Sequence, residues 1–170
     1  MLPEYRKILY ATDLSQNARA AFKHAVSFAK TYQAKIYLVH VVPTLKLHDR
    51  ELILASSGFG ANVPDIISDE ERLKAVTAEI VEKIRGRLAR FAKEELGGNE
   101  SDLDWLGGIE VLEGVSPTEE ILSASERLNV DLLVFGSHSK GVLKQTFLGS
   151  VAEKVLERTC RPFLVVPLVD

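Results

Sequence analysis

Short apolar segments alternate with segments of helical periodicity along the whole of this 170-residue chain. Apolar residues recur at three- and four-residue spacing over about 15–32, 68–91, 116–128 and 150–158, which predicts helices. Alternating strands and helices predict an α/β fold with a doubly wound, five-stranded parallel sheet and helices on both faces. The five segments with the length and composition of buried strands are residues 7–11, 35–42, about 105–112, 131–135 and 163–166.

Local signals mark the ends of several predicted elements. Ser15 and Ser116 stand at N-cap positions, and Pro117 follows Ser116 at the first helical position. The residues 68–71 (SDEE) form a capping box for the long helix, and Gly97-Gly98 ends it. The helices are therefore expected to begin and end close to these residues.

Two segments do not follow the alternation. Residues 44–67 lose their periodicity and contain Gly, Ser, Asn and Pro, so we expect a loop insertion there, with a short helix at 52–55. Gly107-Gly108 inside the third strand predicts a bulge or a bend. The length and the 46% apolar content suit one domain that spans residues 1–170.

Charge and cysteine content narrow the classes of partner. The formal charge is −3, so the chain has no basic excess for nucleic acid or for an anionic membrane, and we expect neither as a partner. The single Cys160 cannot form an internal disulfide, and residues 1–13 contain no apolar stretch of the length that a secretory signal needs. No apolar run reaches the roughly 18 residues of a spanning helix. We expect a cytoplasmic protein.

The segment 134–150 (VFGSHSKGVLKQTFLGS) carries most of the chemical information. It joins a predicted buried strand to a helix through glycines and hydroxyl side chains. The first N–H groups of a helix lack intrahelical partners and carry partial positive charge, so they suit a phosphate group. In a doubly wound sheet such a loop lies at the carboxyl ends of the strands, where ligands bind.

Two common nucleotide motifs do not fit. Gly136 and Gly141 have the spacing of a Walker loop, but Val and Leu at 142–143 replace the required Lys and Ser or Thr. Residues 58–60 (GFG) begin like a dinucleotide fingerprint, but Val63 replaces the third glycine and no strand precedes the segment.

The chain resembles the universal stress protein family from its first predicted strand to its last. The matching segments are 11–15 (ATDLS), 40–42 (HVV), 114–117 (GVSP) and the glycine loop, which is the segment from Gly136 to Gly149 that leads to Ser150. The resemblance implies an adenine nucleotide alpha hydrolase-like, Rossmann-like fold and ATP binding in the stress response. It also implies a homodimer that pairs through the last strand, Phe163–Pro167.

By this resemblance Asp13 and the main chain of Val41 would hold adenine and ribose, and the glycine loop would hold the phosphates. A Mg²⁺ or Mn²⁺ ion could accompany the triphosphate, held mainly by its oxygens. The full set of candidate nucleotide-binding residues is Ala11, Thr12, Asp13, Val41, Gly136, Ser137, His138, Ser139, Gly149, Ser150 and Val151.

Ser139 departs from the family loop, which has glycine at that position. If the position needs a left-handed backbone, serine costs roughly 1–2 kcal/mol, which is about tenfold in affinity. Alternatively the serine hydroxyl donates to a phosphate oxygen and recovers part of that loss. The alternative function is a dimeric interaction module of the same family that binds no nucleotide.

The sequence gives little support for a catalytic site or a metal site. Ser137 and His138 are adjacent, so their side chains do not face one another as a nucleophile and base would. No Cys and His spacing predicts zinc. We therefore expect a binding protein with at most weak nucleotide hydrolysis, in which occupancy alters the dimer surface or the 44–67 loop.

Overall fold

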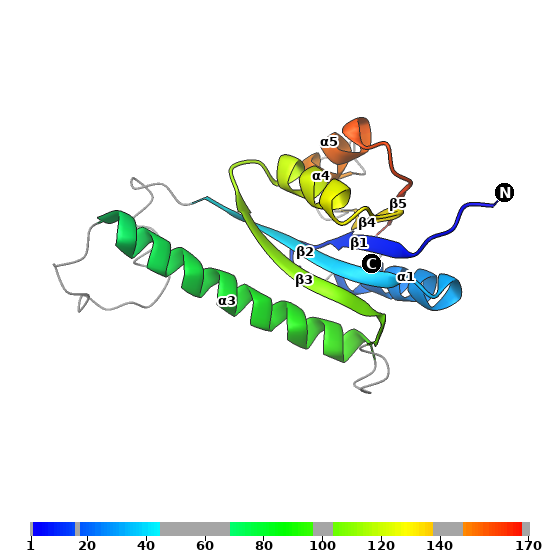
Figure 1. Cartoon of the computed structure of the whole chain (residues 1–170), viewed down its shortest axis with the longest axis horizontal. Helices are drawn as coiled ribbons and strands as arrows, with labels where there is room; N and C mark the ends of the chain where they lie inside the picture. The colour runs from blue at the N-terminus through cyan, green and yellow to red at the C-terminus, as the bar shows by residue number, and fades with distance from the viewer. Residues whose placement is uncertain (1, 16–17, 45–68, 97–103, 138–147, 168–170) are drawn as a thin grey trace.

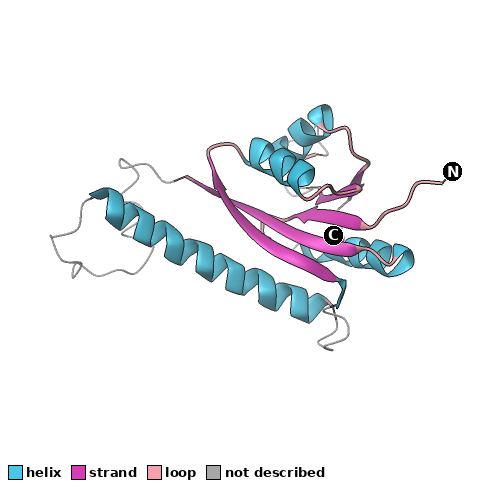
Figure 2. Ribbon diagram, in the orientation of Figure 1, coloured by secondary structure: helices cyan, strands magenta, loops and turns pink. Residues whose placement is uncertain are grey.

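A computed structural model describes residues 2–15, 18–44, 69–96, 104–137 and 148–167 (Figure 1). Figure 2 shows its strands and helices. The strands are β1 (Lys7–Ala11), β2 (Lys35–Pro43), β3 (Leu106–Gly114), β4 (Leu132–Gly136) and β5 (Phe163–Val166). The helices are α1 (Ala18–Tyr32), α3 (Asp69–Glu95), α4 (Pro117–Arg127) and α5 (Ser150–Arg158).

The five strands form one parallel sheet in the order β3-β2-β1-β4-β5. This confirms the predicted doubly wound α/β fold. From β1 the chain proceeds outward to β2 and β3, and then returns to the other side of β1 to form β4 and β5. The order of the chain therefore reverses between β1 and β4, which is the point where sheets of this kind leave a crevice at the carboxyl ends of their strands.

Each face of the sheet packs against two helices. Along β1, Ile8 and Tyr10 lie in the core formed with α1 and α3, whereas Leu9 and Ala11 lie in the core formed with α4 and α5. Figure 1 shows α4 and α5 on one side of the sheet and α1 and α3 on the other. Because both faces are covered, residues 8–11 of β1 and 132–135 of β4 are all buried and apolar, which is why these strands appear in the sequence as short uninterrupted runs.

Most element boundaries agree with the predictions. Ser116 caps α4, since its side chain accepts a hydrogen bond from Glu119 N. Gly107 forms the predicted bulge, because Ile36 pairs with Leu106 and the next residue of β2 pairs with Gly108. The predictions for 45–67, for Ser68 and for Gly97-Gly98 lie outside the described residues.

The long helix α3 is buried unevenly along its length. Leu88 and Phe91 in its C-terminal half are buried in the core, whereas Leu73 and Val76 in its N-terminal half are only half-buried. Figure 1 shows the N-terminal half of α3 extending past the sheet. The regular apolar spacing predicted the helix correctly but did not show which half contacts the core.

Truncation of a central core residue should destabilise the fold strongly. Leu133 is fully buried in β4 between Leu9 and Phe163 on the neighbouring strands, so Leu133→Ala should lower the free energy of unfolding by about 2–5 kcal/mol. Leu156→Ala is the matched control, because Leu156 is 46% exposed, and it should change stability by no more than about 0.5 kcal/mol. Urea unfolding measures both, and equal losses would contradict this core assignment.

Candidate functional site

A cavity of about 420 Å³ lies at the carboxyl ends of β1, β2 and β4, where the chain order reverses. The first turns of α4 and α5 border it, and so does the turn that connects β1 to α1. Its lining residues are Tyr10, Ala11, Thr12, Asp13, Ser15, Ala18, Val39, His40, Val41, Pro117, Ile121, Phe135, Gly136, Gly149, Ser150, Val151 and Ala152.

The turn after β1 forms one side of the cavity. Thr12 N donates to Val39 O at 3.0 Å, which extends the pairing of the two strands one residue past β1. Within the turn, Leu14 N donates to Thr12 Oγ1 at 3.1 Å and Ser15 N donates to Asp13 Oδ1 at 2.9 Å. Leu14 has φ 62°, a left-handed conformation that non-glycine residues adopt rarely. The turn thus places the Asp13 carboxylate at the cavity in a conformation that local hydrogen bonds maintain.

Two side chains outside the turn also contact this region. The imidazole Nδ1 of His40 lies 2.7 Å from the main-chain oxygen of Thr12. The Tyr10 hydroxyl donates to Ala18 O at 2.6 Å, and burial raises the pKa of this phenol well above its ordinary value. Tyr10 is therefore neutral and anchors the start of α1 to the end of β1.

The N-terminus of α5 forms the opposite side of the cavity. Its N-cap is Gly149, which has φ −65° and ψ 149° and no side chain to bond the first-turn amides. The first α-helical bond formed here is Glu153 N to Gly149 O at 3.0 Å, so the N–H groups of 150–152 precede the helical ladder. These amides and the Ser150 hydroxyl supply hydrogen-bond donors and partial positive charge, as an anion site requires.

The walls between these two polar sides are mainly apolar. Val39, Val41, Ile121 and Phe135 supply branched and aromatic surface. No described residue that lines the cavity is Lys or Arg, and within the described part of the chain no three His, Cys, Asp or Glu side chains lie close enough together to hold a metal ion. A flat apolar group with an attached anion suits this combination of walls and amides.

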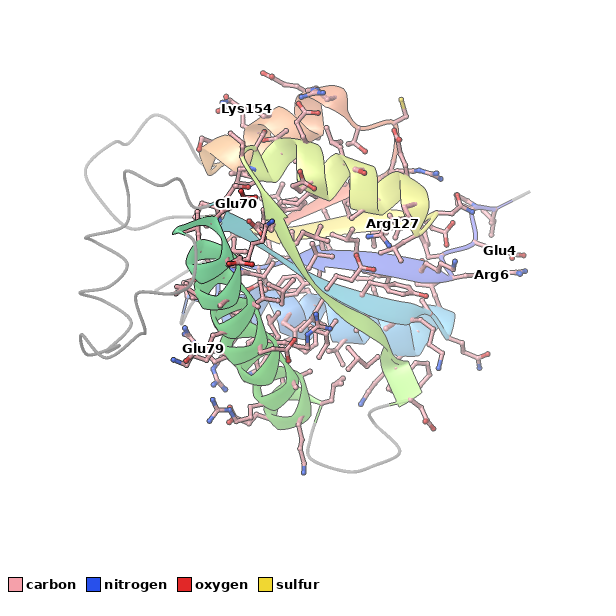
Figure 3. The ribbon with its side chains drawn as sticks, turned by 60° about the vertical axis from the view of Figure 1, so that its left-hand side comes forward. Glu4, Arg6, Glu70, Glu79, Arg127 and Lys154 are labelled. Carbon is pink, nitrogen blue, oxygen red and sulfur yellow. The ribbon has the colours of Figure 1, made fainter. Side chains whose placement is uncertain are left out.

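Ion pairs join the elements around the cavity. Arg158 of α5 donates two hydrogen bonds to the carboxylate of Glu119 of α4. Nη1 donates to Oε1, and Nη2 donates to Oε2 at 3.0 Å. Arg127, labelled in Figure 3, binds Glu110 of β3 at 3.0 and 2.5 Å. These bidentate pairs tie α4 to α5 and to the sheet, so the two helices that border the cavity are linked to each other.

The structure brings most of the predicted site residues together, although they come from four separate segments. Ser137 does not line the cavity: it is buried beside it, and its N–H donates to Val166 O at 2.9 Å. His138 and Ser139 lie outside the described residues. The predicted residues that line the cavity are Ala11, Thr12, Asp13, Val41, Gly136, Gly149, Ser150 and Val151.

Several lining residues were not among the predicted ones. His40 lies in the predicted strand 35–42 and directly precedes Val41, and this adjacency is the signal in the sequence that could indicate it. Pro117 and Ile121 reach the cavity because α4 packs beside it, and no local feature of the sequence indicates that contact.

The parallel sheet, with the cavity at the point where the order of its strands reverses, defines an α/β protein of the adenine nucleotide alpha hydrolase-like fold. The universal stress protein family model matches residues 4–167, and the chain belongs to that family. Universal stress protein MJ0577 of Methanocaldococcus jannaschii is 32% identical over 167 residues, covering 95% of this chain and 94% of the relative. Stress response protein NhaX of Bacillus subtilis is 31% identical over 176 residues, covering 94% and 96%.

Solved structures support the same fold. The structure of hypothetical protein MJ0577 has a TM-score of 0.69 and 29% identity, and 99% of each chain is covered. Universal stress protein UspA from Lactobacillus plantarum has a TM-score of 0.61 and 22% identity, with 97% and 99% covered. A universal stress protein in complex with cAMP has a TM-score of 0.53 and 17% identity, with 98% and 100% covered.

The pair between α4 and α5 predicts a pH-dependent stability. The hydrogen bond from Arg158 lowers the pKa of the Glu119 carboxyl below its ordinary value. A depressed pKa in the folded state means that the stabilisation is present above the ordinary pKa of about 4.3 and is lost as the pH falls through the folded-state pKa. Wild type should therefore be more stable than Glu119→Gln in urea at pH 7, and the difference should shrink at pH 3.

Glu126→Gln is the control for this comparison, because Glu126 is exposed on the same helix. High salt should also reduce the effect at pH 7, since the pair is exposed to solvent. A difference between wild type and Glu119→Gln that is equal at both pH values would contradict the assigned role of the pair.

Proposed function

We propose that this protein binds an adenine nucleotide, foremost ATP, as a nucleotide-responsive dimeric module of the stress response. The observation that carries the proposal is that one cavity is lined by Asp13 in the turn after β1, by Val41 and by the N-terminus of α5, which has no side-chain cap. These parts are far apart in the sequence, and each suits a different part of the same ligand.

The proposed placement of the nucleotide follows from the chemistry of the walls. Adenine would lie against Val39 and Val41, with main-chain groups at the end of β2 reading its edge. The Asp13 carboxylate would accept hydrogen bonds from ribose hydroxyls. The phosphates would lie at Gly149 and Ser150, where first-turn amides donate to oxyanions. In this placement the charged end of the ligand is next to the helix N-terminus and the apolar end is next to branched side chains.

Family membership supports the proposal, and so does the fold, since a protein of the same fold was solved with cAMP, itself an adenine nucleotide. We propose that a Mg²⁺ or Mn²⁺ ion, when it accompanies ATP, is held mainly by the phosphate oxygens, because the described lining offers one carboxylate, Asp13. The described lining also positions no pair of groups as nucleophile and base, so hydrolysis should be far slower than the enzymatic median of about 10 per second.

Substitution of the α5 N-cap tests the phosphate site. Gly149→Asp should weaken ATP binding about tenfold or more, because the new carboxylate repels the phosphates and occupies the first-turn amides. The φ and ψ of Gly149 suit any residue and Asp caps helices well, so thermal stability should stay the same or rise. Calorimetric titration with ATP, with adenosine as the uncharged comparison, measures the effect.

Gly149→Asn is the matched control, because it offers the same cap without the charge. It should bind ATP better than Gly149→Asp and less well than wild type, while adenosine binding changes little across the three proteins. Equal ATP affinity in wild type and Gly149→Asp would place the phosphates elsewhere. Wild type that ignores millimolar ATP would instead favour the ligand-free interaction module.

We also propose that two copies pair through β5. Among the described strands, β5 lies at one edge of the sheet and is paired only with β4. Pro162 O and Val166 O accept from N–H groups on the β4 side, namely Leu133 N and Ser137 N, both at 2.9 Å. Since bonding direction alternates along a strand, the N–H groups of Phe163 and Val165 point toward the open edge, where a second copy can pair.

Removal of one outward N–H should separate the two copies. Val165→Pro eliminates that donor at a position where an edge strand tolerates proline, whereas Val165→Ala shortens the side chain and keeps the donor. Light scattering after gel filtration should give a monomer for Val165→Pro and a dimer for both wild type and Val165→Ala. A monomeric wild type, or a dimeric Val165→Pro, would contradict pairing through this edge.

A further inference from the structure

The imidazole of His40 connects β2 to the turn that follows β1. In the paired strands Ala11 lies opposite Val39, so His40 is the first residue of β2 beyond the end of β1. Its Nδ1 lies 2.7 Å from the main-chain oxygen of Thr12. A carbonyl oxygen only accepts, so the hydrogen of this bond must be on Nδ1.

The turn that receives this bond has an unfavourable backbone conformation. Leu14 has φ 62°, and a leucine side chain disfavours left-handed backbone. The bonds of Leu14 N to Thr12 Oγ1 and of Ser15 N to Asp13 Oδ1 both lie inside the turn, so they set its shape but do not attach it to the sheet. The main-chain bond of Thr12 N to Val39 O and the His40 side chain attach the β1 end of the turn to β2, whereas the bond of the Tyr10 hydroxyl to Ala18 O attaches the α1 end.

We propose that His40 is a positioning residue of the nucleotide cavity, which holds the Thr12-Asp13 main chain in place by donating from Nδ1 to Thr12 O. This inference rests on the proposed function, because the turn it holds is the one assigned to the ribose. A binding group must be held to within about 0.5 Å by the residues that support it. A side-chain bond from the neighbouring strand provides that support for Asp13, whose carboxylate belongs to an exposed residue.

His40→Leu removes the donor and retains an apolar side chain. ATP affinity should fall about five- to tenfold, which corresponds to the usual net contribution of one hydrogen bond. His40→Asn places an amide N–H near the position of Nδ1 and should restore most of the lost affinity. His24→Leu is the control, since His24 is exposed on α1 and does not line the cavity, and it should bind as wild type does.

Two measurements on the ligand-free protein separate this inference from the proposed function. Imidazole ¹⁵N chemical shifts should show His40 protonated at Nδ1. Amide hydrogen exchange at Leu14 and Ser15 should be faster in His40→Leu than in wild type and should slow again in His40→Asn. Should wild type fail to bind ATP, nucleotide binding is refuted while these two measurements still decide the role of His40.

Three results would overturn the positioning role. They are a hydrogen on Nε2 alone, unchanged exchange at Leu14 and Ser15 in His40→Leu, and an ATP affinity for His40→Asn as low as that for His40→Leu in a protein that binds ATP. His40→Asn also tests whether altered packing alone explains the weaker ATP binding of His40→Leu. Asn is smaller than His, so it restores the N–H donor but not the packing volume.

Discussion

The placement of β1 between β2 and β4 is the constraint on which the rest of the structure depends. The chain leaves β1 toward one side of the sheet and returns on the other, and a cavity lies at the carboxyl ends of β1 and β4, where the order reverses. Thr12 N extends the pairing with β2 one residue further, and the turn begins there. Asp13 and the N-terminus of α5 therefore face one cavity, although more than 130 residues separate them.

The two sides of the cavity offer different polar groups. On the β1 side a carboxylate is presented by a turn with left-handed backbone at Leu14, which hydrogen bonds maintain. On the α5 side the donors are main-chain amides, which a glycine cap leaves without a side-chain partner. Apolar walls lie between them, and a hydrogen bond to a charged ligand would be stronger beside such walls than at an open surface, because the local dielectric is lower.

Local sequence patterns predicted the helices and strands well, but they predicted less completely how these elements pack on one another. Strands β1 and β5 and helix α5 have the predicted bounds, because short apolar runs and a glycine-serine cap mark them. The bulge at Gly107 was also predictable, since paired glycines interrupt a strand. The half-burial of Leu73 was not predictable from spacing alone, because regular spacing does not show how far a helix extends past the sheet.

The same distinction holds for the candidate site. Asp13 follows β1, Val41 lies near the end of β2 and Gly149 directly precedes α5, so both the sequence pattern and the family resemblance indicated them. The bond between His40 and Thr12 depends on the register of β1 against β2, which no local pattern of the sequence shows.

The most direct test of the central claim is an amide chemical-shift titration of the ¹⁵N-labelled protein with ATP and, separately, with adenosine. Nucleotide binding in this cavity predicts that both ligands shift the amides near Asp13 and Val41, and that ATP alone shifts those of Ser150 and Val151 strongly. Amides of Ser150 and Val151 that do not respond to millimolar ATP would contradict the claim that the start of α5 receives the phosphates.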